Sequence, residues 1–183
     1  MSQIAIKGAT TGTGVFTLES PATNTDRTLI LPDEAGTVLT SASPVVYPKG
    51  GPAFSAYQSS AQTLSSATFT KIQLQAEEFD TENCFDNTTN YRFTPTVAGY
   101  YMISGAFAIS AFVTQIQLAI YKNGGIFKEG CNLTGAGNTS MSALIYLNGT
   151  TDYVELYAWI SGAQATASGY QYTYFQGVLV RAD

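Results

Sequence analysis

Apolar and polar side chains alternate with a period of two through most of the chain, and this pattern restricts the chain to β folds. In "TQIQLAIYK", Ile116, Leu118 and Ile120 occupy every second position, as in a strand that buries one face. No segment shows a 3.6-residue period over three turns. We therefore expect about eight to ten strands after residue 52, and an all-β sandwich or jelly roll rather than an α/β enzyme.

Two Asn-Gly pairs interrupt the alternating runs. Asn123-Gly124 follows "TQIQLAIYK", and Asn148-Gly149 lies between "MSALIYL" and "DYVELYAWI". Because both residues tolerate positive φ, an Asn-Gly pair between two such runs favours a tight hairpin. The sequence therefore predicts a hairpin at each pair.

Proline usage divides the chain near residue 52. Five of the six prolines lie at or before this position, and "SASPVVYPKGGP" is typical of an extended linker. We expect a short β segment over 1–43, a linker over 44–52 and one domain, the head, over 53–183. No repeat of fixed period is found, which argues against a solenoid or β-helix.

The low charge of the chain limits its partners. Charged residues make up only 11% of the sequence and aromatic residues 13%, and a surface so poor in charge is more typical of a subunit packed against its own copies. The net charge is −5, with eight Lys and Arg residues and no basic run, so nucleic-acid binding is not expected. No stretch approaches the roughly 20 apolar residues of a spanning helix, and the N-terminus lacks the pattern of a secretory leader. We expect no membrane insertion.

The sequence offers little catalytic or metal-binding chemistry. It contains no histidine, which removes the commonest general base and the usual nucleophilic triads. Paired carboxylates can hydrolyse glycosides, but no evident acid–base pair is present, so an enzyme is not expected and no cofactor is predicted. The two cysteines, Cys84 and Cys131, are interpreted as free thiols, with one bridge between loops left open.

One dense acidic segment, "EEFDTENCFD" over residues 77–86, has two interpretations. It carries Glu77, Glu78, Asp80, Glu82 and Asp86, and hard cations such as Ca²⁺ require several oxygen ligands. The spacing matches no calcium motif. A solvated loop between strands is the favoured interpretation.

Large aromatic side chains are the stronger signal. Over 153–160 one strand face is aliphatic and the other carries Tyr153, Tyr157 and Trp159. A final strand is expected over 170–180, with Tyr170, Tyr172 and Tyr174 on one face. A sheet with large side chains on both faces needs a second layer or a partner subunit, and Tyr and Trp suit subunit contacts. Stacking on sugars is the alternative. The residues predicted to form the subunit interface are Tyr100, Met102, Tyr153, Tyr157, Trp159, Tyr170, Tyr172 and Tyr174.

The bend in "NYRFTPTVAGYYMISG" predicts the faces of the following strand. Pro95 can end one strand, and Gly99 permits close backbone approach at the start of the next. Because successive side chains point to opposite faces, we expect Tyr101 and Ile103 in the subunit core, and the two side chains at 100 and 102 at the interface.

Five segments in register resemble a known family. "AFSAYQ", "NYRFTPTVAGYYMISG", "LAIYKNGG", "YLNGTTDYVELYAW" and "YFQGVLV" resemble the globular head of complement component one, q subunit, and its tumour-necrosis-factor-like relatives. The resemblance covers about residues 52–181. It implies a ten-stranded jelly roll that assembles as a compact homotrimer, with the first strand, the last strand and the strand after the Phe-Thr-Pro bend nearest the axis. The family's calcium ligands have no match here, so calcium binding is not carried over.

The N-terminal part resembles a second group of proteins. "GTGVFTLESPATNTDRTLILPDEAGTVLT", residues 12–40, is similar to short β segments near the N-termini of bacteriophage tail fibres and other virion appendages; a generic β-hairpin followed by a Pro-Asp turn is the alternative. The residues that would carry such an anchor are Thr28, Leu29, Leu31, Pro32, Asp33 and Gly36.

Together the two resemblances imply a small virion fibre, made in the host cytoplasm. Residues 1–43 would bind other virion proteins at tail or capsid, as in a tail fibre or head fibre. The trimeric head would bind a glycan or protein of the host surface. A capsid decoration protein without a receptor role is the alternative, and a glycan-degrading enzyme fits the residues least.

Overall fold

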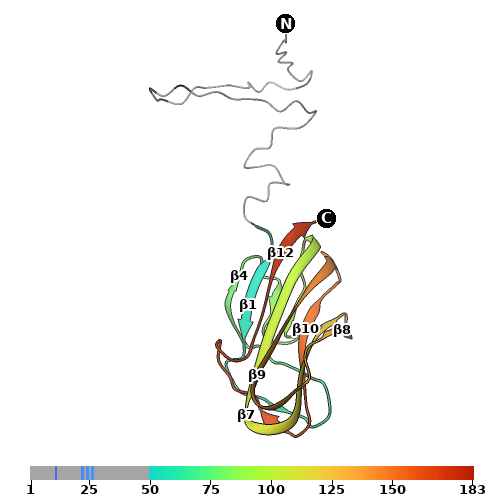
Figure 1. Cartoon of the computed structure of the whole chain (residues 1–183). Helices are drawn as coiled ribbons and strands as arrows, with labels where there is room; N and C mark the ends of the chain where they lie inside the picture. The colour runs from blue at the N-terminus through green and yellow to red at the C-terminus, as the bar shows by residue number, and fades with distance from the viewer. Residues whose placement is uncertain (1–10, 12–21, 23, 25, 27–49) are drawn as a thin grey trace. The chain divides into compact units, whose positions relative to one another are not determined.

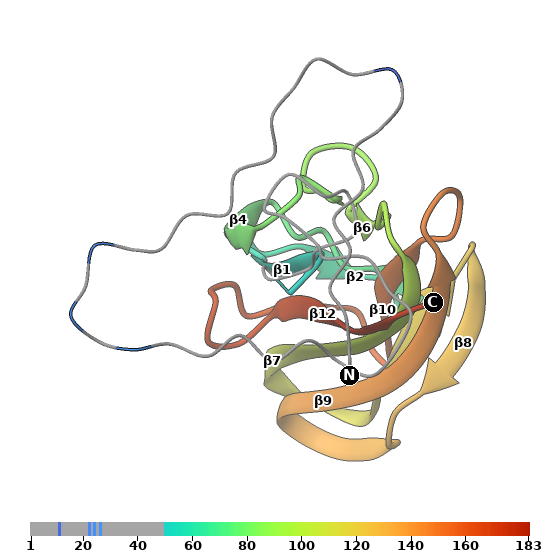
Figure 2. The same ribbon diagram turned by 90° about the horizontal axis from the view of Figure 1, so that it is seen from above.

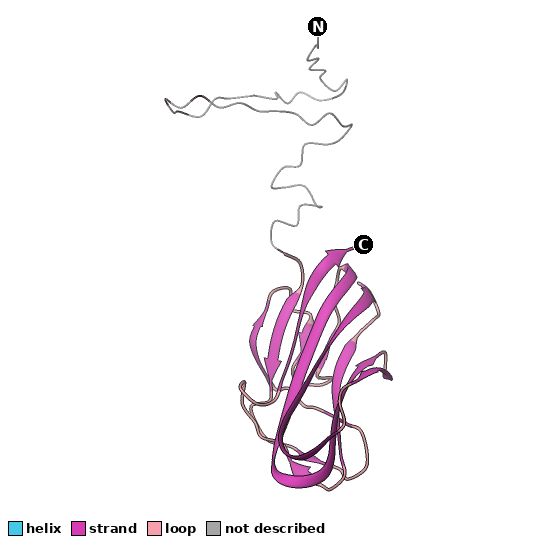
Figure 3. Cartoon of the chain, viewed as in Figure 1, coloured by secondary structure: helices cyan, strands magenta, loops and turns pink. Residues whose placement is uncertain are grey.

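The computed structural model describes residues 50–183, together with Thr11, Ala22, Asn24 and Asp26. The chain divides into two units, Met1–Ser43 and Pro44–Asp183, and residues 50–183 all belong to the second. The six predicted anchor residues, between Thr28 and Gly36, lie outside the described residues. Every regular element between residues 50 and 183 is a strand (Figure 3). In this described part, no helix has the length and hydropathy needed to cross a membrane.

Twelve strands make up the described part of the chain. They are β1 (Ala53–Tyr57), β2 (Thr63–Leu64), β3 (Thr70–Lys71), β4 (Ala76–Asp80), β5 (Phe85–Asp86), β6 (Arg92–Phe93), β7 (Ala98–Lys122), β8 (Gly125–Glu129), β9 (Leu133–Asn148), β10 (Val154–Ile160), β11 (Gln164–Ala165) and β12 (Tyr174–Ala182).

Ten of these strands form two layers that share the long strand β7, and β2 and β11 pair as a separate two-stranded sheet (Figures 1 and 2). The first half of β7 pairs with β12 and β9, and β12 continues through β1 to β4; this is the first layer. The second half of β7 pairs with β8 and β10, and β10 continues to β3 and β6; this is the second layer. The β7–β9 register shifts between Ile109 and Ile116, where bulges let a strand bend from one layer to the next. The prediction of an all-β jelly-roll sandwich is confirmed.

Aromatic rings fill the space between the layers. Phe54 of β1 is fully buried and stacks on Phe93 of β6, with ring centroids 4.4 Å apart. Phe175 of β12 meets Phe54 edge-on at 5.3 Å, and Tyr101 of β7 meets Phe93 at 5.6 Å. Such offset and edge-on contacts add about 0.5–1.5 kcal/mol each to the burial of the rings. Both layers therefore depend on one aromatic core.

The Phe-Thr-Pro bend behaves as its residues predict. Strand β6 ends before Pro95 and β7 begins at Ala98. A Cβ on Gly99 would lie 2.3 Å from the backbone oxygen of Arg181, so only glycine permits this close approach of β7 to β12. Tyr101 is fully buried and donates its hydroxyl hydrogen to the carbonyl oxygen of Val97 at 2.7 Å. The predicted core position of Tyr101 is confirmed, as is that of Ile103, which is also fully buried.

The first Asn-Gly pair forms the predicted hairpin between β7 and β8. Asn123 and Gly124 have φ angles of 54° and 80°, the positive values that a two-residue primed turn requires. The pairing of Lys122 with Gly125 closes the turn.

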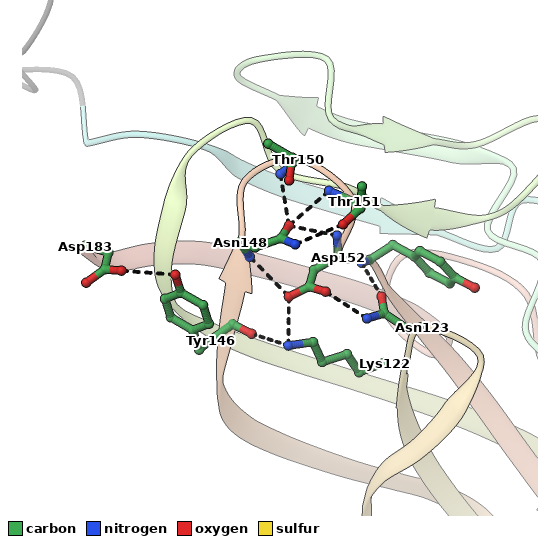
Figure 4. A network of polar contacts seen from close by, with 9 residues as sticks. Lys122, Asn123, Tyr146, Asn148, Thr150, Thr151, Asp152 and Asp183 are labelled. Carbon is green, nitrogen blue, oxygen red and sulfur yellow. Dashed lines mark hydrogen bonds and ion pairs between the residues drawn. The ribbon is translucent and has the colours of Figure 1, made fainter.

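The second Asn-Gly pair does not form a hairpin, because β9 pairs with β7 and not with β10. The Asn148 side-chain oxygen instead accepts hydrogen bonds from the backbone N–H groups of Thr150, Thr151 and Asp152 (Figure 4). An Asn side chain can mimic a backbone turn in this way. The prediction of a tight hairpin at Asn148 is therefore wrong: the segment is an Asn-capped loop that carries the chain between layers.

The two loops are joined by one polar network at the end of the sandwich that also holds the C-terminus (Figure 4). Asp152 accepts hydrogen bonds from the side chains of Lys122 at 2.8 Å and Asn123 at 2.7 Å. The Asn123 side-chain oxygen in turn accepts the backbone N–H of Tyr153. We call this end of the sandwich, where Gly51 also packs against Leu179, the proximal end.

The last strand is shorter than the sequence predicts. It begins at Tyr174, not at residue 170, because Gly169 has a φ of +117° and accepts hydrogen bonds from the backbone N–H groups of Tyr172 and Thr173. Tyr170 and Tyr172 therefore lie in a turn before β12, and the prediction that they share a strand face with Tyr174 is wrong.

Candidate assembly surface

The outward face of the first layer carries a patch of exposed apolar side chains, here called the apolar face. Alternation places one set of side chains in the core and the other set on this face. The members of the face that are large and at least one-third exposed are Phe79, Tyr100, Met102, Leu144, Tyr146, Val178 and Val180.

Strand register brings these side chains together from four strands. Met102 of β7 pairs with Val178 of β12 on one side and with Leu144 of β9 on the other. Tyr100 pairs with Tyr146 of β9, and their rings meet edge-on at 5.4 Å. Met102 therefore lies at the centre of the patch.

The apolar face is also hollowed. A depression of about 310 Å³ opens between Phe79, Met102, Val178 and Gln176. The fully buried Phe54 lies beneath it. Contiguous apolar patches of this kind are rare on single subunits and mark interaction sites.

Polar groups lie at the rim of the apolar face. The hydroxyl of Tyr146 donates to Asp183 at 3.0 Å, and this hydrogen bond is the main reason that the pKa of Tyr146 is raised. At the opposite edge, Ser55 donates to Glu78 of β4 at 2.7 Å. An apolar centre with a polar rim is the usual anatomy of a subunit interface.

The structure separates the eight residues predicted for the interface. Tyr100 and Met102 point outward as predicted, 41% and 42% exposed, and Tyr174 lies on the same face of β12 as Val178. Tyr170 contacts Tyr57 of β1 edge-on at 6.1 Å from its turn, next to this face. Tyr172 lies in the same turn and is exposed.

Tyr157 and Trp159 lie on β10, in the second layer, and Tyr153 directly precedes this strand. Their side chains alternate with the buried Val154, Leu156 and Ala158, so they face away from the core on the far side of the sandwich. One flat interface cannot include both these three residues and Tyr100, Met102 and Tyr174 of the first layer. The period-two pattern is the same in β7 and β10, and it contains no signal for the layer to which each strand belongs.

The aromatic side chains of β10 are engaged within the chain. Tyr157 stacks on Tyr121 with centroids 3.8 Å apart, and the guanidinium of Arg92 lies 4.2 Å from the ring of Tyr153. Beside them, Lys71 forms an ion pair of 2.5 Å with Glu155, whose side chain is 4% exposed. Burial raises the pKa of Tyr157 to about 12. This outer surface is therefore a packed cluster of rings and charges.

Five members of the apolar face were not predicted: Phe79, Leu144, Tyr146, Val178 and Val180. A signal for four of them exists in the sequence. "ALIYL" and "GVLV" are apolar at both odd and even positions, the same two-faced pattern that drew attention to residues 153–160. Phe79 carries no such signal, because it reaches the face only through the pairing of β4 with β1.

Most of the acidic segment belongs to strands, because residues 77–80 lie in β4 and Phe85–Asp86 is β5, which leaves a loop over residues 81–84. Asp86 accepts hydrogen bonds from the backbone N–H groups of Thr89, Thr88 and Asn90, and these bonds hold its pKa well below the usual range. Between residues 50 and 183, no group of three or more Cys, Asp or Glu side chains is arranged to hold a metal ion. The interpretation of residues 77–86 as one solvated loop is therefore wrong for all but residues 81–84.

Both cysteines are free thiols. Cys84 is buried in the core and Cys131 is exposed after β8, so the bridge left open by the sequence does not form. Burial raises the pKa of the Cys84 thiol, which lowers its reactivity.

Comparison with known proteins finds solved structures of the same fold. No protein-family model and no curated sequence matches the chain. Among solved structures, the globular domain of the zebrafish complement 1qA protein is 18% identical with a TM-score of 0.53, covering 72% of this chain and 99% of its own. Murine APRIL is 8% identical with a TM-score of 0.58, covering 70% and 98%. The PRD1 vertex protein P5 is 11% identical with a TM-score of 0.57, covering 72% and 98%. At these identities the likeness concerns the jelly-roll fold.

Proposed function

We propose that the chain is a structural fibre protein of a bacteriophage virion, whose head assembles as a homotrimer and binds the host surface. The apolar face is the observation that carries this proposal. A single subunit would leave these side chains in water, whereas burying them against copies of the same chain removes apolar area at about 25 cal/mol per Å².

The assembly is a closed trimer around the apolar face. The resemblance to the complement and tumour-necrosis-factor-like heads implies this arrangement, with the first strand, the last strand and the strand after the Phe-Thr-Pro bend nearest the axis. These three are β1, β12 and β7, which lie next to one another, and β12 and β7 carry four of the seven side chains of the apolar face. Tyr100, Met102 and Tyr174 are interface residues in this proposal; Tyr153, Tyr157 and Trp159 are not.

The virion role rests on two likenesses. Residues 12–40 resemble the N-terminal segments of tail fibres and other virion appendages, and a phage vertex protein shares the fold of the head. Residues 1–43 would bind another virion protein, and the head would act as a receptor-binding module without enzymatic activity. Three weak sites on one trimer would then act together, which raises the apparent affinity without new contacts.

The decisive experiment combines mass and location. Sedimentation equilibrium of the full chain at micromolar concentration should give three times the mass of 19.5 kDa, and labelled chain should bind host cells and be found on purified virions. A monomer would contradict the assembly. A trimer found on the capsid whose deletion lowers particle heat resistance, but leaves adsorption normal, would favour a decoration protein.

A further inference from the structure

The end of the sandwich opposite the C-terminus, here called the distal end, is built from four segments that are far apart in the sequence (Figure 1). They are residues 58–69, 108–115, 133–139 and 161–173. Backbone hydrogen bonds join them. The N–H of Ala167 donates to the carbonyl oxygen of Ala108 at 2.7 Å, and the N–H of Ser161 donates to the carbonyl oxygen of Gln115 at 3.0 Å. The last of the four is joined to the first by Thr166 N–H, which donates to Gln62 at 2.9 Å.

No charged residue occurs in these four segments. Half of their residues are Ser, Thr, Asn or Gln, and every Asp, Glu, Lys and Arg between 50 and 183 belongs to another segment. The proximal end differs, because Lys122, Asp152 and Asp183 are all found there. The sandwich is therefore charged at one end and neutral, but rich in hydrogen-bonding groups, at the other.

Aromatic rings are exposed at the neutral end. Phe112, at the bend of β7, is 69% exposed, the highest value among the large apolar side chains of the described part. Tyr170 and Tyr172 are 56% and 48% exposed. Unlike the rings of the β10 surface, Tyr172 has no ring contact within residues 50–183.

Tyr172 forms one wall of a hollow of about 350 Å³ between the bend of β7, strand β9 and the turn before β12. Ser110 and Asn138 line the same hollow. Within the described residues, the hydroxyls of Tyr172 and Ser110 and the side-chain amide of Asn138 make no hydrogen bond. The hollow thus combines one aromatic ring with a lining that is almost entirely apolar and carries no charge, and the side chains of Ser110 and Asn138 supply unused polar groups beside that ring.

We propose that this hollow binds an uncharged sugar residue of a host-surface polysaccharide. The ring of Tyr172 would pack against the C–H face of the sugar, while Ser110 and Asn138 would exchange hydrogen bonds with its hydroxyls. An anionic sugar or a charged protein patch would find no counter-ion at the distal end, so the absence of charge favours a neutral partner. This inference rests on the proposed host-binding function and names its ligand.

The hollow is compatible with assembly through the apolar face. Both open on the outward side of the first layer. Ser104, Ser140 and Ser142 lie between the hollow and Met102 along the strands, and Tyr174, which pairs with Ala106, is the interface residue nearest to the hollow. A trimer joined through the apolar face would carry three such hollows at its distal end. Each weak sugar contact would be repeated three times.

The test uses the full-length trimer and two fractions of the host envelope, neutral and acidic polysaccharide separated by anion exchange. The neutral fraction should compete with the binding of labelled trimer to host cells, and the acidic fraction should not. Tyr172→Ala and Asn138→Ala should each lower affinity about fivefold per subunit and about a hundredfold for the trimer. Ile126→Ala, at a side chain of similar exposure (50%) on β8, is the matched control and should bind like the wild type.

The outcomes separate this inference from the proposed function. Three results would show that the proposed sugar site is wrong while the fibre function stands. The trimer could bind cells with only the acidic fraction competing, protease treatment of the cells could abolish binding, or both hollow variants could bind normally. If the trimer binds no host cells, the host-binding function itself fails. Thermal unfolding of each variant at the wild-type temperature establishes that a loss of binding is not a loss of folding.

Discussion

Placing a charge at the centre of the apolar face should dissociate the trimer without unfolding the subunit. Met102 is 42% exposed in the subunit, and its neighbours across the strands, Val178 and Leu144, are 44% and 54% exposed. In an isolated subunit, a lysine at position 102 can reach water past these side chains. We therefore expect Met102→Lys to change the free energy of unfolding of the monomer by less than about 0.5 kcal/mol.

The cost in the trimer is much larger. Burying a methionine side chain fully contributes about 1.5–3 kcal/mol, so burying the exposed share of Met102 contributes about 1 kcal/mol per subunit. A partly desolvated ammonium without a partner adds about 2 kcal/mol. The three subunits together lose about 9 kcal/mol, which lowers the association constant by about six orders of magnitude.

Sedimentation velocity across a concentration series measures this change. Met102→Lys should sediment as a folded monomer at micromolar concentration. Ile126→Lys, a lysine at a 50% exposed site on β8 of the second layer, is the matched control and should remain a trimer. A Met102→Lys protein that still sediments as a trimer would show that subunits meet through another surface, and a Met102→Lys protein that unfolds would show that the face is part of the subunit core.

Three further predictions concern the subunit itself. Lys71→Met should destabilise the subunit by about 3 kcal/mol in urea titrations, since the buried carboxylate of Glu155 loses its cation. A double variant that also carries Glu155→Leu should recover much of the lost stability. A Lys71→Met subunit of wild-type stability would show that the ion pair does not stabilise the fold. Gly99→Ala should cost about 1–3 kcal/mol in the same assay, because the new Cβ would overlap a backbone oxygen of β12, and an unchanged midpoint would refute the close approach. The hydrogen bond from Lys122 lowers the pKa of Asp152, so Asp152 contributes stability that is present above its unfolded pKa and is lost as pH falls through its lower folded pKa. Asp152→Asn should therefore be less stable than the wild type at pH 7, and this difference should shrink as the pH is lowered through the acid range. A difference that does not depend on pH would show that the charge has no role.

Local pattern was sufficient for the features that depend on neighbours in the sequence. Two-residue alternation assigned Tyr101 and Ile103 to the core and Met102 to the opposite face, because a strand turns each successive side chain over. Asn123-Gly124 predicted its hairpin because both residues must adopt positive φ. These features require only the backbone geometry of a few consecutive residues.

Local pattern failed where the outcome depended on which strands pair. Asn148-Gly149 has the same composition as the first pair, but β9 pairs with β7, so the segment that contains Asn148 is a loop between layers. Tyr157 and Tyr100 show the same alternation, yet they lie on opposite layers of the sandwich because β10 pairs with the second half of β7. Nothing within a strand specifies its partner.

The two surfaces proposed for function differ in the same way. The charge-free segments of the distal end can be read directly from the sequence, since charge is a property of each residue alone. Their convergence around Tyr172 and Asn138 depends on hydrogen bonds between residues more than 50 positions apart, such as Ala108 and Ala167. Likewise, Leu144, Met102 and Val178 become one apolar face only when three strands lie side by side. Residue chemistry and strand periodicity are encoded locally, whereas a surface is made by long-range pairing, which only the folded chain specifies.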